Sequence, residues 1–243
     1  MIIKNLMKNR LILLRHGESL WNKENIYTGW YDIGLTEKGY NQCNLIADKL
    51  IEKKFIPNVI YTSEQKRALE TSKNIKRNLK EKTQIKLPII PKWRLNERHY
   101  GHVTGLNKSL LKKTYSEKEV NNWVNTYYGQ PPNLKKNHIS DYVLNEIPNY
   151  SSGNYGKSLS FGESLQMVSR RMIPYYNSII LNSIKIGDNV LIVSHSNTLK
   201  VLIRYLEDIS KDDIHSIKVN NLEPIVYDFD KHLHPIRNLD FFN

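Results

Sequence analysis

The sequence predicts an α/β protein of three layers, in which helices cover both faces of a mostly parallel sheet. Short apolar segments with the length of buried strands occur at residues 11–14, 59–61, 190–193 and 225–227. Segments with helical periodicity separate them, and this alternation is typical of parallel sheets. Because ligands bind at the carboxyl ends of such strands, the residues that follow each strand are the first candidates for function.

Capping residues and apolar spacing place the first three helices. Thr36 is a suitable N-cap for a helix that extends to about residue 53 and has apolar residues along one face. Ser63 follows the second strand and is expected to cap a helix at about residues 65–79. Residues 110–127 are broadly helical in pattern, with Trp123 as the largest apolar side chain.

The second half of the chain contains an irregular stretch and two further helices. Residues 129–160 are rich in Asn, Pro, Ser and Tyr, and we interpret them as a long surface excursion. A helix is expected at residues 163–180, where Pro174 should kink or restart it because proline lacks a backbone N–H. The last helix, at about residues 197–206, follows directly on the strand at residues 190–193.

The length and composition favour a globular protein with a single catalytic domain at residues 1–243. A chain of 243 residues, of which 40% are hydrophobic, can bury a core without disulfides or bound metal. No apolar run reaches the roughly 18 residues of a membrane-spanning helix, and we expect no secretory signal. The single cysteine, Cys43, excludes an internal disulfide and a cysteine-based metal site. We therefore expect a cytoplasmic protein that binds no membrane.

The net charge of +12 lies in the first half of the chain. Residues 1–120 contain 24 Lys and Arg against 12 Asp and Glu, whereas residues 121–243 contain 12 of each kind. Such an excess favours nucleic acid, a membrane surface or a small anionic substrate as the partner. Nucleic-acid binding is the remote alternative, because the basic residues at 66–86 cannot share one helix face and no nucleic-acid-binding motif accompanies them.

Arginine and histidine side chains follow three of the predicted strands. Arg15 and His16 follow the first strand, Arg67 comes soon after the second, and His195 follows the strand at residues 190–193. Arginine forms bidentate bonds with phosphate oxygens, so this edge of the sheet favours a bound phosphoryl group. An imidazole beside arginines loses its proton more easily and can then attack phosphorus. The pattern therefore predicts phosphoryl transfer to a histidine.

Such a reaction also requires an acid that protonates the leaving oxygen. Glu97 is the candidate, although an ion pair with the neighbouring Arg94 or Arg98 would account for this residue equally well. His99 and His102 lack the spacing of a metal site, and we expect no metal.

Several segments of the chain resemble the cofactor-dependent phosphoglycerate mutases, a family of the histidine phosphatase superfamily. The RHG motif at residues 15–17 indicates the superfamily, and longer segments are similar to the mutase branch. They are LRHGESLWN at 14–22, YTGW at 27–30, LTEKG at 35–39, YTS at 61–63, WRLNERHYG at 93–101 and GLNK at 105–108. The similarity extends from about residue 11 to about residue 230.

The resemblance implies a phosphoglycerate mutase-like fold and a glycolytic isomerase that interconverts 3-phosphoglycerate and 2-phosphoglycerate. The reaction would pass through a phosphohistidine at His16, primed by 2,3-bisphosphoglycerate and without a metal. Glu97 would be the proton donor and acceptor, and Arg15, Arg67 and His195 would hold the phosphoryl group. The candidate substrate-binding residues are Gly17, Glu18, Ser19, Asn22, Thr28, Gly29, Arg98, His99, Tyr100, Lys108, Ser196 and Asn197. The resemblance also implies a small phosphorylated substrate and a homodimer or homotetramer.

The chain departs from the mutases where they hold the anionic end of their substrate. The family has two arginines directly after the tryptophan that is Trp123 here, whereas Val124 and Asn125 follow it in this chain. The loss of two such cations would remove charge-assisted bonds of roughly 1.5–3 kcal/mol each. The candidates that would restore the charge are Lys108, Lys112 and Lys113.

Two further departures favour hydrolysis over isomerisation. Ser196 replaces the glycine of the family's HGN motif, and the last residues include Phe241 and Phe242 in place of a Lys-rich tail. A phosphohistidine that is less well covered meets water more often. The alternative function is therefore that of a histidine phosphatase that hydrolyses a small phosphorylated metabolite.

Overall fold

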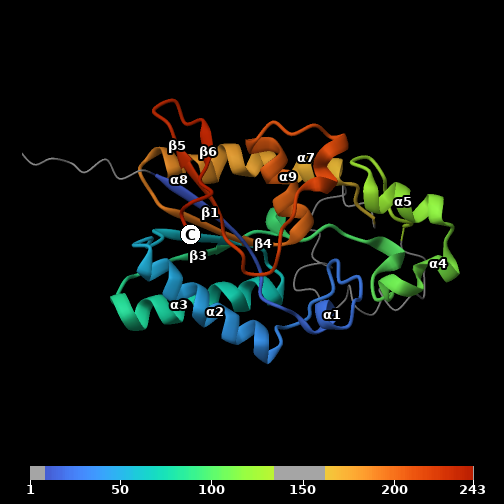
Figure 1. Cartoon of the computed structure of the whole chain (residues 1–243), viewed down its shortest axis with the longest axis horizontal. Coiled ribbons are helices and arrows are strands. Elements are labelled where there is room, and N and C mark those ends of the chain that lie inside the picture. Colours follow the sequence, from blue (N-terminus) through green and yellow to red (C-terminus); the bar gives the residue numbers. More distant parts are fainter. Residues whose placement is uncertain (1–8, 134–161, 243) are drawn as a thin grey trace, which may run out of the picture.

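A computed structural model describes residues 9–133 and 162–242, and these residues contain a six-stranded sheet between two layers of helices (Figure 1). The order is β3-β2-β4-β1-β5-β6, with β1 at Arg10–Arg15, β2 at Val59–Thr62, β3 at Ile89–Pro91, β4 at Val190–Ser194, β5 at Ile225–Phe229 and β6 at Pro235–Arg237. The first four strands pair in parallel, whereas β5 and β6 are antiparallel to their neighbours. The predicted α/β class with a mostly parallel sheet is confirmed.

The alternation of side chains along β1 explains why helices cover both faces of the sheet. Leu11 and Leu13 belong to one buried cluster, whereas Ile12 and Leu14 belong to another. The first cluster packs under α7 (Leu165–Tyr175) and α9 (Ser196–Leu206), and the second under α2 (Glu37–Glu52) and α3 (Lys66–Thr83) (Figure 1). The sheet is thus apolar on both sides, and its polar chemistry is confined to the strand ends.

The predicted starts of α2 and α3 are both confirmed to within one residue, but the cap expected for α3 is wrong. Thr36 caps α2, because its hydroxyl oxygen accepts a hydrogen bond from the Gly39 amide at 3.0 Å. Gln65, not Ser63, is the N-cap of α3 and forms no side-chain cap bond. The Ser63 hydroxyl accepts from the Gln65 amide at 3.0 Å and donates to Asn96 at 3.0 Å, and this directs it to the site described below.

The helix expected at residues 110–127 is divided in the structure. It consists of η3 (Lys108–Leu110), α4 (Leu111–Thr114) and α5 (Glu117–Asn125). The break occurs because Ser116 and Glu119 form a capping box that starts a new helix. Trp123 is buried and packs edge-on against Tyr115 with ring centroids 4.9 Å apart.

The helix expected at residues 163–180 continues past Pro174 without a restart. It comprises α7, the π-helical segment η4 (Tyr176–Ile180) and α8 (Leu181–Lys185). Ser164 is its N-cap. The wider π turn directly follows the turn in which Pro174 lacks a donor, so the chain absorbs the proline within a continuous helix.

The expected excursion at residues 129–160 lies outside the described residues from residue 134 onward.

Several short elements were not predicted, because three or four residues are too few to show a periodicity. They are α1 (Leu20–Lys23), η1 (Trp93–Leu95), η2 (Gly101–Val103), β3 and β6, and the slightly longer η5 (Asp212–Ser216) was missed as well. Within residues 9–133 and 162–242, no helix combines the length and the apolar character that a bilayer crossing demands.

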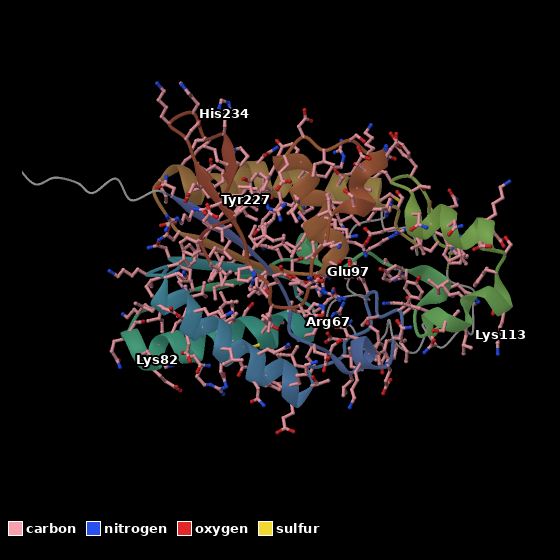
Figure 2. All side chains as sticks on the ribbon, viewed as in Figure 1. Arg67, Lys82, Glu97, Lys113, Tyr227 and His234 are labelled. Carbon is pink, nitrogen blue, oxygen red and sulfur yellow. The ribbon has the colours of Figure 1, made fainter. Side chains whose placement is uncertain are left out.

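Much of the basic charge of α3 lies at the surface of the molecule. Figure 2 shows Lys82 on the outside of α3, where it pairs with Asp48, whereas Arg67 and Glu97 lie in the interior. Arg67 is only 1% exposed, although it belongs to the same helix as Lys82. One arginine of this basic helix is therefore set apart from the solvated lysines around it.

A close backbone contact holds the loop after β1 against the start of α2. A side-chain carbon at Gly17 would come within 2.9 Å of the Gly39 carbonyl oxygen, and one at Gly39 would overlap the carbonyl oxygen of Glu18. Both positions therefore require glycine, and the contact fixes the segment that carries His16.

We expect Gly39→Ala to lower the free energy of unfolding by about 1–3 kcal/mol, because the added methyl group must displace the backbone of Glu18. Urea unfolding at equilibrium measures the change. Gly34→Ala is the matched control, since its added carbon would meet side-chain ends and no backbone: the Glu70 carboxylate at 3.1 Å and Cε of Lys66 at 3.5 Å. Equal losses in the two variants would contradict the role of the backbone contact.

Candidate active site

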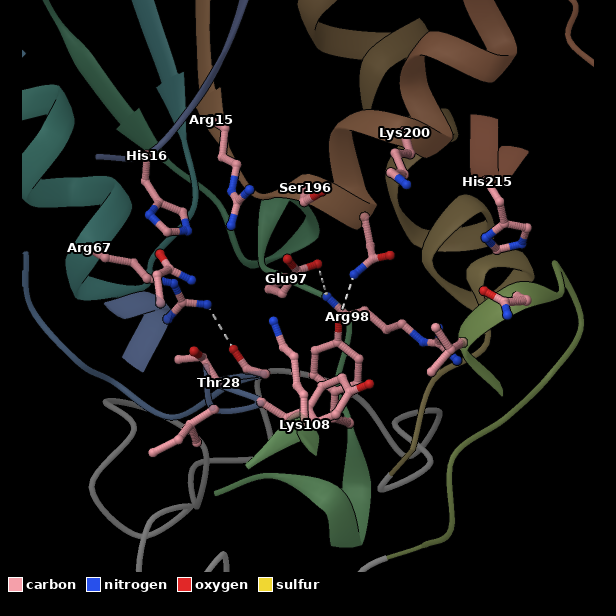
Figure 3. A pocket seen from close by; sticks show the side chains of 18 residues that line it. Arg15, His16, Thr28, Arg67, Glu97, Arg98, Lys108, Ser196, Lys200 and His215 are labelled. Carbon is pink, nitrogen blue, oxygen red and sulfur yellow. Dashed lines mark hydrogen bonds between the residues drawn. The ribbon is translucent and has the colours of Figure 1, made fainter. Parts of the chain in front are cut away.

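A cavity of about 370 Å³ opens at the carboxyl ends of β1 and β4 (Figure 3). Small-molecule sites have volumes of about 300–1,000 Å³, so it can hold a substrate larger than a bare phosphate. Of the residues expected to act on the phosphoryl group, four line the cavity: Arg15, His16, Arg67 and Glu97. Of those expected to bind the substrate, the cavity wall includes Asn22, Thr28, Gly29, Tyr100, Lys108, Ser196 and Asn197.

The hydrogen bonds of His16 define which ring nitrogen can react. Its Nδ1 lies 2.7 Å from the Gly17 carbonyl oxygen, and because a carbonyl can only accept, Nδ1 carries the proton. The Nε2 atom of neutral His16 therefore keeps its lone pair. Main-chain bonds fix the residue in place, since the amide donates to Ser194 at 3.0 Å and the carbonyl accepts from Asn221 at 2.6 Å.

The surroundings of His16 keep its imidazole neutral. Burial lowers the pKa of His16 well below its ordinary value, and the charges of Arg67 and Arg15 lower it further. The ring therefore has a free nitrogen at neutral pH, which is what a nucleophile in a cationic pocket needs.

His195 lies beside His16 but does not form part of the cavity wall. The two ring centroids are 5.0 Å apart and the rings are inclined by 58°. Burial, together with the charge of Arg67, lowers the pKa of His195 well below its ordinary value. The structure thus brings His195 next to His16, whereas the role expected of it, holding the phosphoryl group, stays a prediction.

Ser63 determines the tautomer of His195. The Ser63 hydroxyl donates to Oδ1 of Asn96 at 3.0 Å, and that oxygen also accepts from the Glu64 amide at 3.0 Å. The Ser63 oxygen must then accept from Nε2–H of His195, which lies 2.8 Å away. Within the described part of the chain, Nδ1 of His195 is buried and has no hydrogen-bond partner.

Arg15 and Arg67 supply positive charge next to His16. Burial lowers the pKa of Arg67 to about 10, so it stays charged at neutral pH, and two of its N–H groups donate to the carbonyls of Gly29 and Tyr31 at 2.9 and 3.0 Å. Arg15 donates to the Val219 carbonyl at 3.1 Å, whereas its Nε atom is buried with no partner among the described residues. An unpaired donor of this kind favours a bound anion.

No metal site accompanies these groups among residues 9–133 and 162–242, where no three or more His, Cys, Asp or Glu side chains gather in a way that could hold a metal ion.

The carboxyl group of Glu97 faces the cavity from a rigidly held segment. Its amide donates to Gln65 at 2.7 Å, and its carbonyl accepts from Trp30 at 2.6 Å and Arg171 at 2.9 Å. Oε1 accepts from the Arg98 amide at 2.8 Å. The alternative of an ion pair is not realised, because the Arg94 guanidinium stacks on Trp93 at 4.8 Å and that of Arg98 bonds to backbone carbonyls.

A buried ion pair holds the segment that carries Glu97. Arg171 and Glu163 are 2.7 Å apart, and their side chains are 6% and 3% exposed. Arg171 also donates to the carbonyls of Arg94, Asn96 and Glu97 at 2.8, 3.0 and 2.9 Å. Burial alone would raise the pKa of Glu163, but the Arg171 guanidinium holds it below its ordinary value.

Glu18 and Ser19 were expected to bind substrate, but neither lines the cavity. The Glu18 carboxylate accepts from Lys38 at 3.0 Å and from Thr36 at 3.1 Å. Ser19 caps α1, and its hydroxyl donates to Oδ1 of Asn22 at 2.9 Å. Both side chains therefore bond to residues at the start of a helix, and of these residues Asn22 lines the cavity.

Gly17, His99 and Arg98 also depart from the expected role. The close approach that Gly17 permits is to Gly39, not to a ligand. His99 is buried, and its Nδ1 accepts from the Gly101 amide at 2.9 Å. Arg98 borders the cavity, but its guanidinium donates to the carbonyls of Glu163, Trp123 and Gly129. The buried polar atoms of His99 and Arg98 thus bond to backbone groups and not to a ligand.

The structure adds Lys200 and His215 to the cavity wall, beside the expected Val124 and Asn125. Lys200 lies four residues after Ser196 on α9, so helical spacing from the SHSN segment could have indicated it. His215 comes from η5, and no pattern in the sequence points to it. Of the three lysines expected to restore charge, Lys108 lines the cavity, Lys113 is exposed elsewhere, and the Lys112 side chain is outside the described set.

The chain is similar to known proteins over most of its length. The model of the histidine phosphatase superfamily (branch 1) matches residues 11–239. The fold is similar to that of mycobacterial glucosyl-3-phosphoglycerate phosphatase (TM-score 0.70, 20% identity, 95% of this chain and 97% of that chain). It is also similar to a putative alpha-ribazole-5'-P phosphatase of Escherichia coli (TM-score 0.67, 20%, 95% and 94%). A phosphoserine phosphatase mutant of Entamoeba histolytica has the same fold (TM-score 0.62, 21%, 95% and 95%).

We expect Arg171→Met to lower the free energy of unfolding by about 3–5 kcal/mol, because it leaves the Glu163 carboxylate buried without its cation. Urea unfolding measures the change. Arg170→Met provides the control, since Arg170 is exposed on the same helix. Similar losses in both variants would show that the ion pair does not hold this region.

The lowered pKa of His16 predicts a pH-dependent stability. The unfolded chain takes up a proton at His16 as the pH falls below about 6.5, while the folded chain does not. Stability should therefore fall with pH in this range and be unaffected by His16 above it. Unfolding at about pH 6 and about pH 5 should show a slope steeper by roughly 1 kcal/mol per pH unit in wild type than in His16→Gln. Identical slopes would contradict a neutral buried His16.

Proposed function

The chain belongs to the histidine phosphatase superfamily (branch 1), and on this premise we propose that it is a phosphatase of a small phosphorylated metabolite. The observation that supports this most directly is the neutral His16, whose Nε2 lone pair lies in a cavity lined by Arg15 and Arg67. A phosphoryl group is the ligand that this combination of nucleophile and planar cations suits best.

In the first step, Nε2 of His16 attacks phosphorus while the ester P–O bond breaks. Arg15 and Arg67 stabilise the charge on the phosphoryl oxygens, using the Arg15 donor that is unpaired in the described residues. Glu97, as the carboxylic acid, gives its proton to the leaving oxygen. The alcohol departs, and a P–N bond to His16 remains.

The second step reverses these roles with water as the nucleophile. Glu97, now a carboxylate, takes a proton from the water as its oxygen attacks phosphorus and the P–N bond breaks. His16 is released as the neutral imidazole. Its proton stays on Nδ1, which donates to the Gly17 carbonyl throughout. His195 lies next to His16, with ring centroids 5.0 Å apart, and its Nε2 proton is directed to Ser63. It would therefore donate to the phosphoryl oxygens from Nδ1 only as an imidazolium, a form that the charge of the bound phosphoryl group would favour.

The wall at the end of α5 favours hydrolysis over isomerisation. A mutase must keep its product in place until the phosphohistidine phosphorylates it again. Val124 and Asn125 line the cavity at this point and carry no charge, whereas the resemblance to mutases implied two arginines here. The similar structures named above are all called phosphatases, which agrees with the same preference.

A phosphatase needs no primer. Each substrate molecule phosphorylates His16 directly, so 2,3-bisphosphoglycerate is a substrate at most and not a cofactor in the proposed cycle. The isomerisation of phosphoglycerate that the sequence led us to expect is therefore replaced, in this proposal, by hydrolysis.

One assay with two products tests the proposal. With 3-phosphoglycerate and a panel of other small phosphomonoesters, we expect release of inorganic phosphate to exceed formation of 2-phosphoglycerate, with or without 2,3-bisphosphoglycerate. His16→Ala should lower phosphate release by a factor on the order of 10³ or more, because it removes the nitrogen that forms the phosphoenzyme in the proposed cycle. Glu97→Gln should slow it by about 10²–10⁴.

His232→Ala is the control for the loss of a histidine, because His232 is exposed in the turn between β5 and β6. It should retain wild-type activity. Formation of 2-phosphoglycerate that greatly exceeds phosphate release would overturn the proposal in favour of a mutase, and full activity in His16→Ala would overturn the assignment of the nucleophile.

A further inference from the structure

The cavity extends beyond the region around His16 to an end that the phosphoryl group does not need. Figure 3 shows His16 and Arg67 on one side, Glu97 near the middle, and Lys200 and His215 on the other side. Lys200 is contributed by α9 and His215 by η5. The two side chains therefore converge from separate elements on the part of the cavity that would receive the remainder of the substrate.

The charge of the cavity exceeds what one phosphoryl group can neutralise. Among the described residues that line it, five are arginine or lysine and only Glu97 is acidic. A phosphoryl dianion together with the Glu97 carboxylate would leave two of the five positive charges without a counterpart. Focused charge of this kind inside a cavity attracts a further anion.

Lys200 is the cation at the end of the cavity away from His16. Its side chain is half-buried, and among the described residues it forms no hydrogen bond or ion pair. Burial lowers the pKa of Lys200, while the more distant Glu97 carboxylate partly offsets this effect. A half-buried ammonium without a direct partner is stabilised when an anion binds beside it.

His215 lines the same part of the cavity. Its Nε2 atom is buried and has no hydrogen-bond partner among the described residues. An unsatisfied buried polar atom is unfavourable in the free protein, and an anion that accepts from Nε2–H would remove the penalty. Because Val124 and Asn125, which also line the cavity, carry no charge, such an anion would be held by the side chains from α9 and η5.

We propose that Lys200 and His215 form a second anion subsite, which recognises a carboxylate or second phosphoryl group on the phosphomonoester substrate. This inference rests on the proposed phosphatase function for the position of the first phosphoryl group. It narrows the substrate class to phosphomonoesters that carry another negative charge on the leaving alcohol.

Binding of non-hydrolysable probes tests the subsite without turnover. 3-Phosphonopropionate and propylphosphonate have the same carbon chain, but only the first carries a carboxylate. Titration calorimetry on the full chain should show that wild type binds 3-phosphonopropionate about tenfold or more tightly than propylphosphonate, as expected for one added charge-assisted bond. Lys200→Met and His215→Ala should each lower this ratio several-fold.

Lys113→Ala is the matched control for the loss of a lysine, because Figure 2 shows Lys113 at the outer edge of the molecule, away from Glu97. It should keep the wild-type ratio. His215→Gln retains an N–H donor and should restore part of the preference that His215→Ala loses, which separates recognition from a general loss of structure.

The subsite is overturned if wild type binds the two probes equally, or if Lys200→Met keeps the full preference. These results do not depend on catalysis. Release of phosphate by an enzyme without probe preference would reject the subsite alone, whereas probe preference in a protein that hydrolyses no phosphomonoester would reject the proposed function alone.

Discussion

The parallel pairing of β1 with β4 is the constraint on which the site depends. Arg15 lies opposite Ser194 in this register, so His16 and His195 leave the sheet side by side and their rings come within 5.0 Å. A slip of one residue would turn one side chain of the pair to the other face of the sheet. The apolar alternation of β1 between two helix layers prevents that slip, so core packing and histidine geometry are maintained by the same residues.

The sequence anticipates the central strands and the convergence of charged residues at their carboxyl ends. The central strands have strong apolar patterns, so the fold class and the meeting of His16 with Arg67 could be predicted from local information. The orientation of Glu97 could not, because it depends on Gln65 and Arg171, which are distant in sequence and bond to its backbone. His215 was missed for the same reason: only the tertiary fold brings η5 to the cavity.

Three residues that the motifs placed at the site do not line the cavity. A motif can therefore be right about a segment and wrong about a single position in it. Glu18, Ser19 and His99 belong to segments that build the cavity, yet their polar atoms serve helix ends and backbone amides. A motif therefore identifies the segment that forms a site, whereas burial and hydrogen bonding decide which of its side chains can meet a ligand.

Arg98 fastens the end of α5 by bonds to the main-chain carbonyls of Trp123 and Gly129, at 2.8 Å each. Because these bonds involve only main-chain atoms of the loop, they do not depend on the side chains at residues 124 and 125. Substitutions at Val124 and Asn125 should therefore leave the wall that they form in the same position relative to Glu97. The scaffold thus separates the charge of this wall from the placement of His16 and Glu97, so that the ligands the cavity accepts could change while those two side chains stay where they are.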